Sequence, residues 1–172
     1  METNSLLDEL KKFVRERRWI KNRQRTNIGQ SQKVNGWNSL VEPVYSNTET
    51  SGVILELCQQ LLGVPINCVC LNRNVHCEPH RDGKNQSESY FLMFGDFEGG
   101  ALLIQEPNGI RRIEEKDTWF TFNGKRDLHW NEKILNGTKY SIICFVRDNI
   151  KKHLFQRTET NIKILFGILV LQ

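Results

Sequence analysis

The sequence has no Cys-x-x-Cys pair, and its cysteines number five, so at least one has no partner within the chain. Both features disfavour a disulfide framework and a zinc site, and they favour reduced thiols. The first ten residues are acidic and lack the basic-then-apolar order of a secretory signal. The apolar run at 164–171 is well short of the roughly 20 residues that a spanning helix needs. We therefore expect an intracellular protein, nuclear or cytoplasmic, with no membrane partner.

The length of 172 residues, 38% of them apolar, predicts one domain with a sizeable core. We expect this domain, 1–172, to consist of a helical and basic part at 1–63, a β core at 64–148 and a C-terminal extension at 149–172. Nothing in the sequence predicts the oligomeric state.

Positive charge is concentrated near the N-terminus. Residues 11–40 have nine basic side chains and a single acid, Glu16. An excess of this size indicates a polyanionic partner such as DNA, although a solvated helix face explains the same pattern. The candidates for nucleic-acid binding are Lys11, Lys12, Arg15, Arg18, Lys21, Arg23 and Arg25.

Hydrophobic periodicity predicts helices first and strands afterwards. Apolar residues recur at helical spacing from about Asn4 to Arg18 and again from Thr50 to Leu62, whereas 21–50 is typical of a loop with short strands near 37–45. Turn signals then separate eight short strands, at 66–72, 75–80, 89–95, 101–105, 110–114, 118–122, 127–131 and 139–147. This count predicts a mostly β fold, a double-stranded β-helix or jelly roll with N-terminal helices packed against it. An unrelated sandwich would have the same strands.

Three side chains form a candidate metal site. His80 and Asp82 are two residues apart, so an extended strand directs both to one face, and His129 follows 47 residues after Asp82. Two nitrogens and one carboxylate on one side of a metal are the facial triad of non-haem Fe(II) oxygenases. We predict that these three residues are the metal ligands and the catalytic centre. His76 and His153 are the competing ligands.

The last predicted strand, 139–147, has a candidate binding site for the carboxylate of a co-substrate. Lys139, Ser141 and Arg147 share one face of 139–147. A cation and a hydroxyl two residues apart bind a carboxylate by charge and by hydrogen bonding. We therefore expect Lys139 and Ser141 to hold the distal carboxylate of 2-oxoglutarate, with Arg147 as the rival cation. Alternatively, Lys139 is a solvent-exposed residue at the end of the strand and binds no ligand.

Between residues 66 and 147 the chain has five notable motifs: Asn72-Arg73-Asn74, Pro79-His80-Arg81-Asp82 with Asn85, Gly95–Leu102, His129-Trp130 and Gly137–Ser141. Together they resemble the Fe(II)- and 2-oxoglutarate-dependent dioxygenase superfamily. The His-x-Asp-x-x-Asn form, followed by a Gly-Gly-x-Leu strand, is most similar to the TET/JBP branch, which oxidises methylated pyrimidines and thymine in DNA.

The resemblance implies Fe(II) at His80, Asp82 and His129, 2-oxoglutarate at Lys139, and O2 as the further co-substrate. Ser141 and Asn72 are weaker candidates for the 2-oxoglutarate site. The expected reaction is oxidation of the methyl group of 5-methylcytosine or thymine in DNA. Lys139 departs from the branch, which has Arg there, and is more like the prolyl 4-hydroxylases. Two alternatives to a DNA oxygenase therefore remain: a protein hydroxylase of the prolyl 4-hydroxylase type, and a non-catalytic binding module that retains the fold.

Overall fold

The computed structural model describes residues 2–19, 24–29, 41–42, 49–83, 85–86 and 88–147. Lys21, Arg23, His153 and the predicted extension at 149–172 lie outside these residues. The elements are α1 (Glu2–Glu16), β1 (Arg25–Gly29), β2 (Val41–Glu42), α2 (Glu49–Leu62), β3 (Cys68–Arg73), β4 (Ser89–Gly99), β5 (Leu102–Glu106), β6 (Gly109–Ile113), β7 (Phe120–Phe122), β8 (His129–Asn131) and β9 (Ile134–Phe145).

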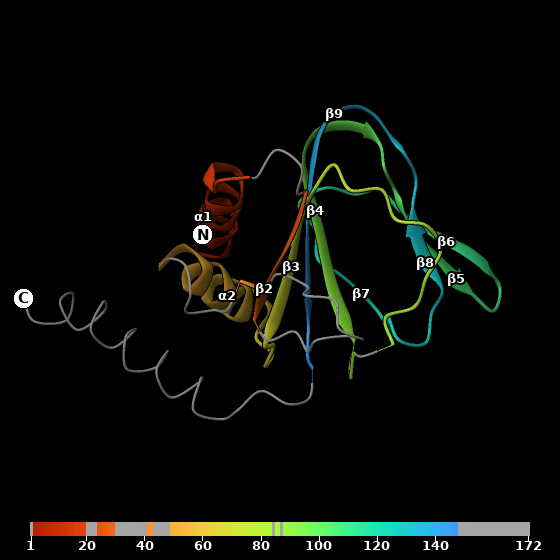
Figure 1. The fold of residues 1–172 in the computed structure, drawn as a ribbon, viewed down its shortest axis with the longest axis horizontal. Helices are drawn as coiled ribbons and strands as arrows, with labels where there is room; N and C mark the ends of the chain where they lie inside the picture. The colour runs from red at the N-terminus through yellow and green to blue at the C-terminus, as the bar shows by residue number, and fades with distance from the viewer. Residues whose placement is uncertain are drawn as a thin grey trace, which may run out of the picture.

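The strands form two sheets that face each other, with the helices on the outer side of the larger one (Figure 1). The larger sheet has the order β2-β1-β3-β9-β4-β7 and the smaller has the order β6-β5-β8. All neighbouring strands pair antiparallel except β1 and β2, which are parallel. The predicted fold class, mostly β with N-terminal helices packed against a jelly roll, is confirmed.

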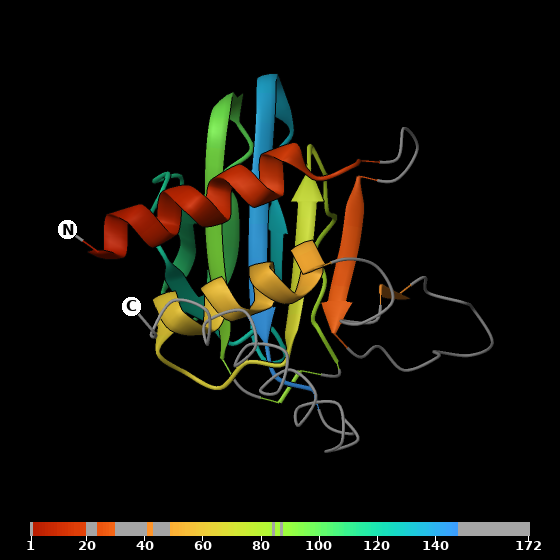
Figure 2. The same cartoon turned by 90° about the vertical axis from the view of Figure 1, so that its left-hand side faces the viewer.

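Side-chain alternation along β4 and β9 separates the core into two layers. Leu92 and Ile142 are fully buried against α1 and α2, which lie across the outer face of the larger sheet in Figure 2. Met93 and Ile143 point the other way, into a second cluster between the sheets. Because the two faces of a strand alternate with a period of two, this register directs the odd-numbered residues of β9 towards the space between the sheets.

Both helices occur close to the predicted positions, and α2 ends where the sequence expects. Gly63 follows its last residue with φ of +64° and donates its N–H to the carbonyl of Gln59 at 2.9 Å. Glycine adopts this left-handed conformation without a steric penalty, and Pro65 then prevents the helix from continuing.

Strand β1 was not predicted, because Arg25–Gly29 lies in the polar stretch expected to be loop. Its partner strand is far along the chain: Arg25 pairs with Asn72 and Gly29 with Cys68. Thr26 and Ile28 are buried. Buried and more exposed side chains alternate along β1, but the strand is too short for this pattern to stand out in the sequence, and only the pairing with β3 identifies it.

The strand predicted at 75–80 is wrong apart from His80, which forms an isolated bridge with His129. Asn74 has φ of +51°, which ends β3, and Pro79 has no N–H to donate. The Asn131 side chain pairs with this backbone instead, accepting from the N–H of Cys77 at 2.8 Å and donating to the carbonyl of Val75 at 3.2 Å. The segment therefore runs beside β8 without a regular ladder.

Candidate active site

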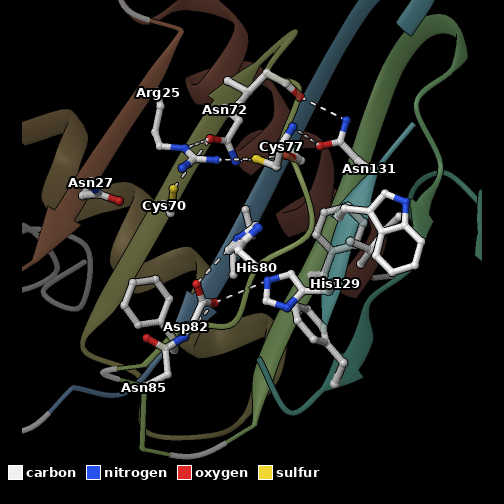
Figure 3. Close-up of a pocket in the computed structure, with 18 of the residues that line it drawn as sticks. Arg25, Asn27, Cys70, Asn72, Cys77, His80, Asp82, Asn85, His129 and Asn131 are labelled. Carbon is white, nitrogen blue, oxygen red and sulfur yellow. Dashed lines mark hydrogen bonds and ion pairs between the residues drawn. The ribbon is translucent and has the colours of Figure 1, made fainter. Parts of the chain in front are cut away.

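His80, Asp82 and His129 converge between the two sheets (Figure 3). The bridge between His80 and His129 has two backbone hydrogen bonds of 3.0 Å, and it brings the two imidazoles to 4.3 Å between ring centroids. Asp82 Oδ1 lies 3.8 Å from His80 Nε2, and Asp82 Oδ2 lies 3.7 Å from His129 Nε2. One ligand atom from each residue lies within 4.8 Å of the other two. The nitrogens and oxygens are too far apart to hydrogen-bond and face a common point.

The two imidazoles are oriented by backbone carbonyls. His80 Nδ1 lies 2.7 Å from the carbonyl oxygen of Glu78, and His129 Nδ1 lies 2.9 Å from that of Asp127. A carbonyl only accepts, so each Nδ1 carries a proton and each Nε2 presents a lone pair. Burial lowers the pKa of His129 below its usual range, which favours the neutral form that binds metals.

Asp82 is held from two sides. Its backbone N–H donates to the carbonyl of Gly124 at 2.8 Å, and the amide of Asn85 donates to Oδ2 at 3.1 Å. Asn85 is buried and also donates to Ser89 Oγ at 3.3 Å. A Cβ on Gly124 would lie only 2.8 Å from Asp82 Oδ2, so the carboxylate occupies space that only glycine leaves open.

This donor set fits a divalent transition metal such as Fe(II). Two imidazole lone pairs and a carboxylate point to one side, and each has the outer partner that orients metal ligands. On the other side, the triad borders a cavity of about 190 Å³ that leaves room for further ligands. His76, the competing candidate, is exposed and its Nδ1 lies 3.5 Å from Glu78 Oε1, outside the triad.

Lys139 lies in the wall of the same cavity and is only 5% exposed. Its ammonium donates to the carbonyl of Gly100 and lies 5.7 Å and 5.8 Å from the ring centroids of Phe91 and Phe97. Burial lowers the pKa of Lys139 to about 8. No carboxylate among the described residues pairs with it, so an anion entering the cavity would be its natural partner.

A row of polar side chains crosses the larger sheet beside Lys139. The strand register aligns Arg25 with Asn72 and Asn72 with Ser141. Arg25 Nε donates to Asn72 Oδ1 at 2.7 Å, and Asn72 Nδ2 donates to Ser141 Oγ at 3.2 Å. All three residues line the cavity.

Arg147 lies at the far end of the cavity wall. Its guanidinium stacks over the ring of Phe145 at 5.1 Å, and its backbone is clamped by two 2.9 Å hydrogen bonds to the side chain of Asn67. The buried Nε has no partner among the described residues. Eight residues separate Arg147 from Lys139, or about 26 Å of extended strand, so the two cations serve different parts of the cavity.

Of the predicted nucleic-acid-binding cations, the five that the structure describes do not form one surface. Lys11, Lys12, Arg15 and Arg18 belong to α1 or directly follow it, on the outer face of the larger sheet. Lys11 is paired with Asp8 at 2.9 Å and with Asp117 at 3.2 Å. Arg25 lies apart from them, in the cavity on the opposite face (Figure 3).

Comparisons with known proteins bear on the fold. No model of a protein family matches the chain, and no curated protein matches its sequence. Among solved structures, NgTET1 in complex with 5mC DNA is similar at a TM-score of 0.56 and 11% identity, over 92% of this chain and 75% of that one. A Pseudomonas putida prolyl-4-hydroxylase is similar at a TM-score of 0.50 and 12% identity, over 86% of each chain.

The chain has the fold of the 2-oxoglutarate oxygenases. The resemblance expected from the sequence is thus confirmed at the level of the fold. An oxidoreductase of the 2OG-Fe(II) oxygenase family from Burkholderia pseudomallei aligns over 58% of this chain and 57% of that one, at 15% identity. The TM-score of that alignment is 0.46. No helix in the described part of this oxygenase fold is long and apolar enough to cross a bilayer.

Several residues of this oxygenase fold were missed as parts of the site. Asn85 orients Asp82, and Gly124 makes room for it. Phe122 packs its edge on the His129 ring at 4.8 Å between centroids. The i+3 spacing of Asn85 from Asp82 was a visible signal, whereas nothing local marks Gly124 or the place of Arg25.

Proposed function

We propose that this chain is an Fe(II)- and 2-oxoglutarate-dependent dioxygenase. The observation that carries the proposal is the convergence of His80, Asp82 and His129 on one side of a common point, with a cavity on the other side. Each of these side chains has an outer hydrogen-bond partner that fixes its orientation. A non-catalytic module would not need ligands held in this way.

Lys139 is the proposed anchor for the distal carboxylate of 2-oxoglutarate, with Ser141 and Asn72 beside it. Its ammonium is buried in the cavity wall, and no carboxylate in the described part of the chain forms an ion pair with it. When bound at the triad with 2-oxoglutarate and O2, iron would supply the oxidation of an unactivated C–H bond, with succinate and CO2 as coproducts. The protein's part is to hold the ligands, to position the carboxylate and to keep the aromatic lining of the cavity dry.

The substrate that we propose is the methyl group of a modified pyrimidine, 5-methylcytosine or thymine, in DNA. In support, the neighbour solved with 5mC DNA aligns over more of this chain than the prolyl-4-hydroxylase does, at a higher TM-score. A base within a duplex would have to leave the stack to reach a metal between two sheets. Such a substrate implies a nuclear or cytoplasmic location.

A prolyl-hydroxylase type of reaction is the second candidate. One specific feature favours it: the buried cation on β9 is Lys139, as the resemblance to prolyl 4-hydroxylases leads one to expect. Both candidates require the same metal and co-substrate, so they differ only in the molecule that enters the cavity.

A succinate-release assay tests these proposals. The purified chain, loaded anaerobically with Fe(II), would be offered 2-oxoglutarate, O2 and a panel of oligonucleotides with 5-methylcytosine or thymine, methylated RNA and prolyl peptides. We expect release with methylated DNA, and loss of release in His80→Ala, Asp82→Ala and His129→Ala. His76→Ala is the matched control, because His76 is exposed and outside the triad. Activity retained in any triad variant would refute the assignment of the metal site.

A further inference from the structure

Arg25 is a cation in the wall of the cavity that the metal and 2-oxoglutarate do not account for. It reaches the cavity from β1, two strands away from Lys139 on β9. Neighbouring strands lie about 4.8 Å apart, so the strands that carry the two cations are about 10 Å apart, and Lys139 is two residues along β9 from Ser141, the residue level with Arg25. A single small dicarboxylate bound at both the metal and Lys139 leaves Arg25 without an anion.

Two neighbouring side chains orient the Arg25 guanidinium through Nε and Nη2 and leave the donors of Nη1 available to a ligand. Nε donates to Asn72 Oδ1 at 2.7 Å, and Nη2 donates to Cys77 Sγ at 2.8 Å. The Asn72 amide in turn donates to Ser141 Oγ, which orients the acceptor of the Arg25 Nε–H. Among the described residues, Nη1 makes no hydrogen bond and no carboxylate forms an ion pair with the guanidinium, although Asp82 acts on its charge from a longer distance. A guanidinium held on one edge, with the other edge open, is suited to two oxygens of one anion.

The charges around the cavity favour the binding of such an anion. Its described lining has three cations, Arg25, Lys139 and Arg147, and a single carboxylate, Asp82. A divalent metal and the dianion of 2-oxoglutarate cancel each other. An excess of two positive charges therefore remains for the molecule that is oxidised.

We propose that Arg25 binds a backbone phosphate next to the target base and is thereby a specificity residue for an anionic substrate. This inference rests on the proposed function, since a nucleotide drawn into the cavity brings a phosphate on each side of its sugar. A prolyl peptide has no such obligatory anion. The nucleic-acid contact that sets the substrate in place is then in the cavity, on the opposite face of the sheet from α1.

The test is a binding experiment that does not depend on turnover. A short single-stranded oligonucleotide with one 5-methylcytosine is titrated anaerobically into protein loaded with Mn(II) and 2-oxoglutarate. In a matched series, one phosphate at a time is replaced by a neutral methylphosphonate. We expect one position next to the methylated base to weaken binding to the wild-type protein about tenfold or more.

In Arg25→Gln we expect binding of the unmodified oligonucleotide to weaken by a similar factor and the same methylphosphonate to have no further effect. The affinity for 2-oxoglutarate should stay within about twofold. Arg25→Lys retains the charge but loses the paired N–H donors of the guanidinium, so its affinity for the oligonucleotide should lie between those of the wild-type protein and Arg25→Gln. Arg111→Gln is the matched control, because Arg111 is an exposed arginine on β6 whose nearest carboxylate is Glu106 at 3.7 Å.

Each other result counts against the phosphate contact. If every methylphosphonate acts alike in the wild-type protein and in Arg25→Gln, while the oligonucleotide is still oxidised, Arg25 has no phosphate partner and the proposed function stands. If Arg25→Gln weakens 2-oxoglutarate instead, the residue serves the co-substrate. If it weakens only a glutamate-containing prolyl peptide, the partner is a carboxylate. If no oligonucleotide binds or is oxidised, the proposed substrate is wrong and the phosphate contact is wrong with it.

Discussion

Gly124 is the residue on which the place of the Asp82 carboxylate depends most directly. A Cβ there would lie 2.8 Å from Asp82 Oδ2 and 3.1 Å from Ser89 Oγ. Gly124→Ala should therefore displace the carboxylate, and we expect the affinity for Mn(II), measured by calorimetric titration, to fall about tenfold. Gly83→Ala is the control beside the same ligand, since nothing lies within 4 Å of its Cβ. Equal affinity in the two variants would contradict the steric argument.

The titration of Lys139 makes a second prediction at this scale. Burial lowers its pKa to about 8, so the free protein loses this charge as the pH rises through 8. A bound carboxylate stabilises the ammonium and raises its pKa, so above pH 8 binding must take up a proton. We expect the affinity for 2-oxoglutarate to fall by about tenfold for each further pH unit, and to be nearly constant below pH 8.

Comparison with Lys139→Arg isolates this effect, because arginine stays charged throughout the range. The ratio of the wild-type and Lys139→Arg dissociation constants, measured by calorimetry between pH 7 and 9.5, should rise with pH. Arg147→Ala, which removes the rival cation two residues beyond the end of β9, should follow the wild-type profile. A flat ratio, or a loss of 2-oxoglutarate binding only in Arg147→Ala, would show that Arg147 is the anchor.

At the scale of elements, what could be predicted from the sequence depends on how far apart the interacting residues are. The two helices and most strands after Ile66 follow from local periodicity and turn residues, and the i, i+2 spacing of His80 and Asp82 is equally local. The alternation that puts Lys139, Ser141 and Arg147 on one side of the segment 139–147 is local as well, and all three residues line the cavity, although β9 itself ends at Phe145.

Elements that depend on distant partners were not predictable in this way. β1 is a strand because Arg25–Gly29 pairs with β3, and its sequence has little strand character of its own. The segment at 75–80 has the composition of a strand, yet Asn131 takes its hydrogen bonds. The same long-range pairing puts Arg25 in the cavity, although composition alone grouped it with the cations of α1.

The attachment of the 75–80 segment to β8 makes a prediction for Asn131. Its side chain satisfies the N–H of Cys77 and the carbonyl of Val75. Asn131→Ala leaves both without that partner, and we expect the free energy of unfolding in urea to fall by about 1–3 kcal/mol. The segment leads to His80, so the affinity for Mn(II) should also fall. Asn108→Ala, in the exposed turn between β5 and β6, should change neither quantity.

If Asn131→Ala lowered the stability but kept the metal affinity, the bridge between His80 and His129 would be sufficient to hold the ligands. The segment would then be a structural attachment only.

For the whole molecule, the larger sheet separates two basic regions. α1 packs on the outer face through Leu10 and Val14, whereas the candidate metal site is on the inner face. A nucleic acid bound by the cations of α1 would have to wrap around an edge of the sheet to bring a base to His80. The two regions should therefore contribute independently, one to non-specific affinity for long DNA and the other to the position of the substrate.

Reversing two exposed cations of this helical region, Lys12→Glu and Arg18→Glu, tests that separation. On a short single-stranded substrate that fills only the cavity, we expect KM and its salt dependence to be unchanged. On a long duplex, binding should weaken, and its log–log salt slope should become shallower by about 0.9 for each phosphate that the variant no longer binds. An equal rise in KM for the short substrate would mean that the outer helix reaches the molecule in the cavity. An unchanged slope on the long duplex would mean that these cations only solvate the helix, and the protein would then have to bind phosphates from the cavity side of the sheet.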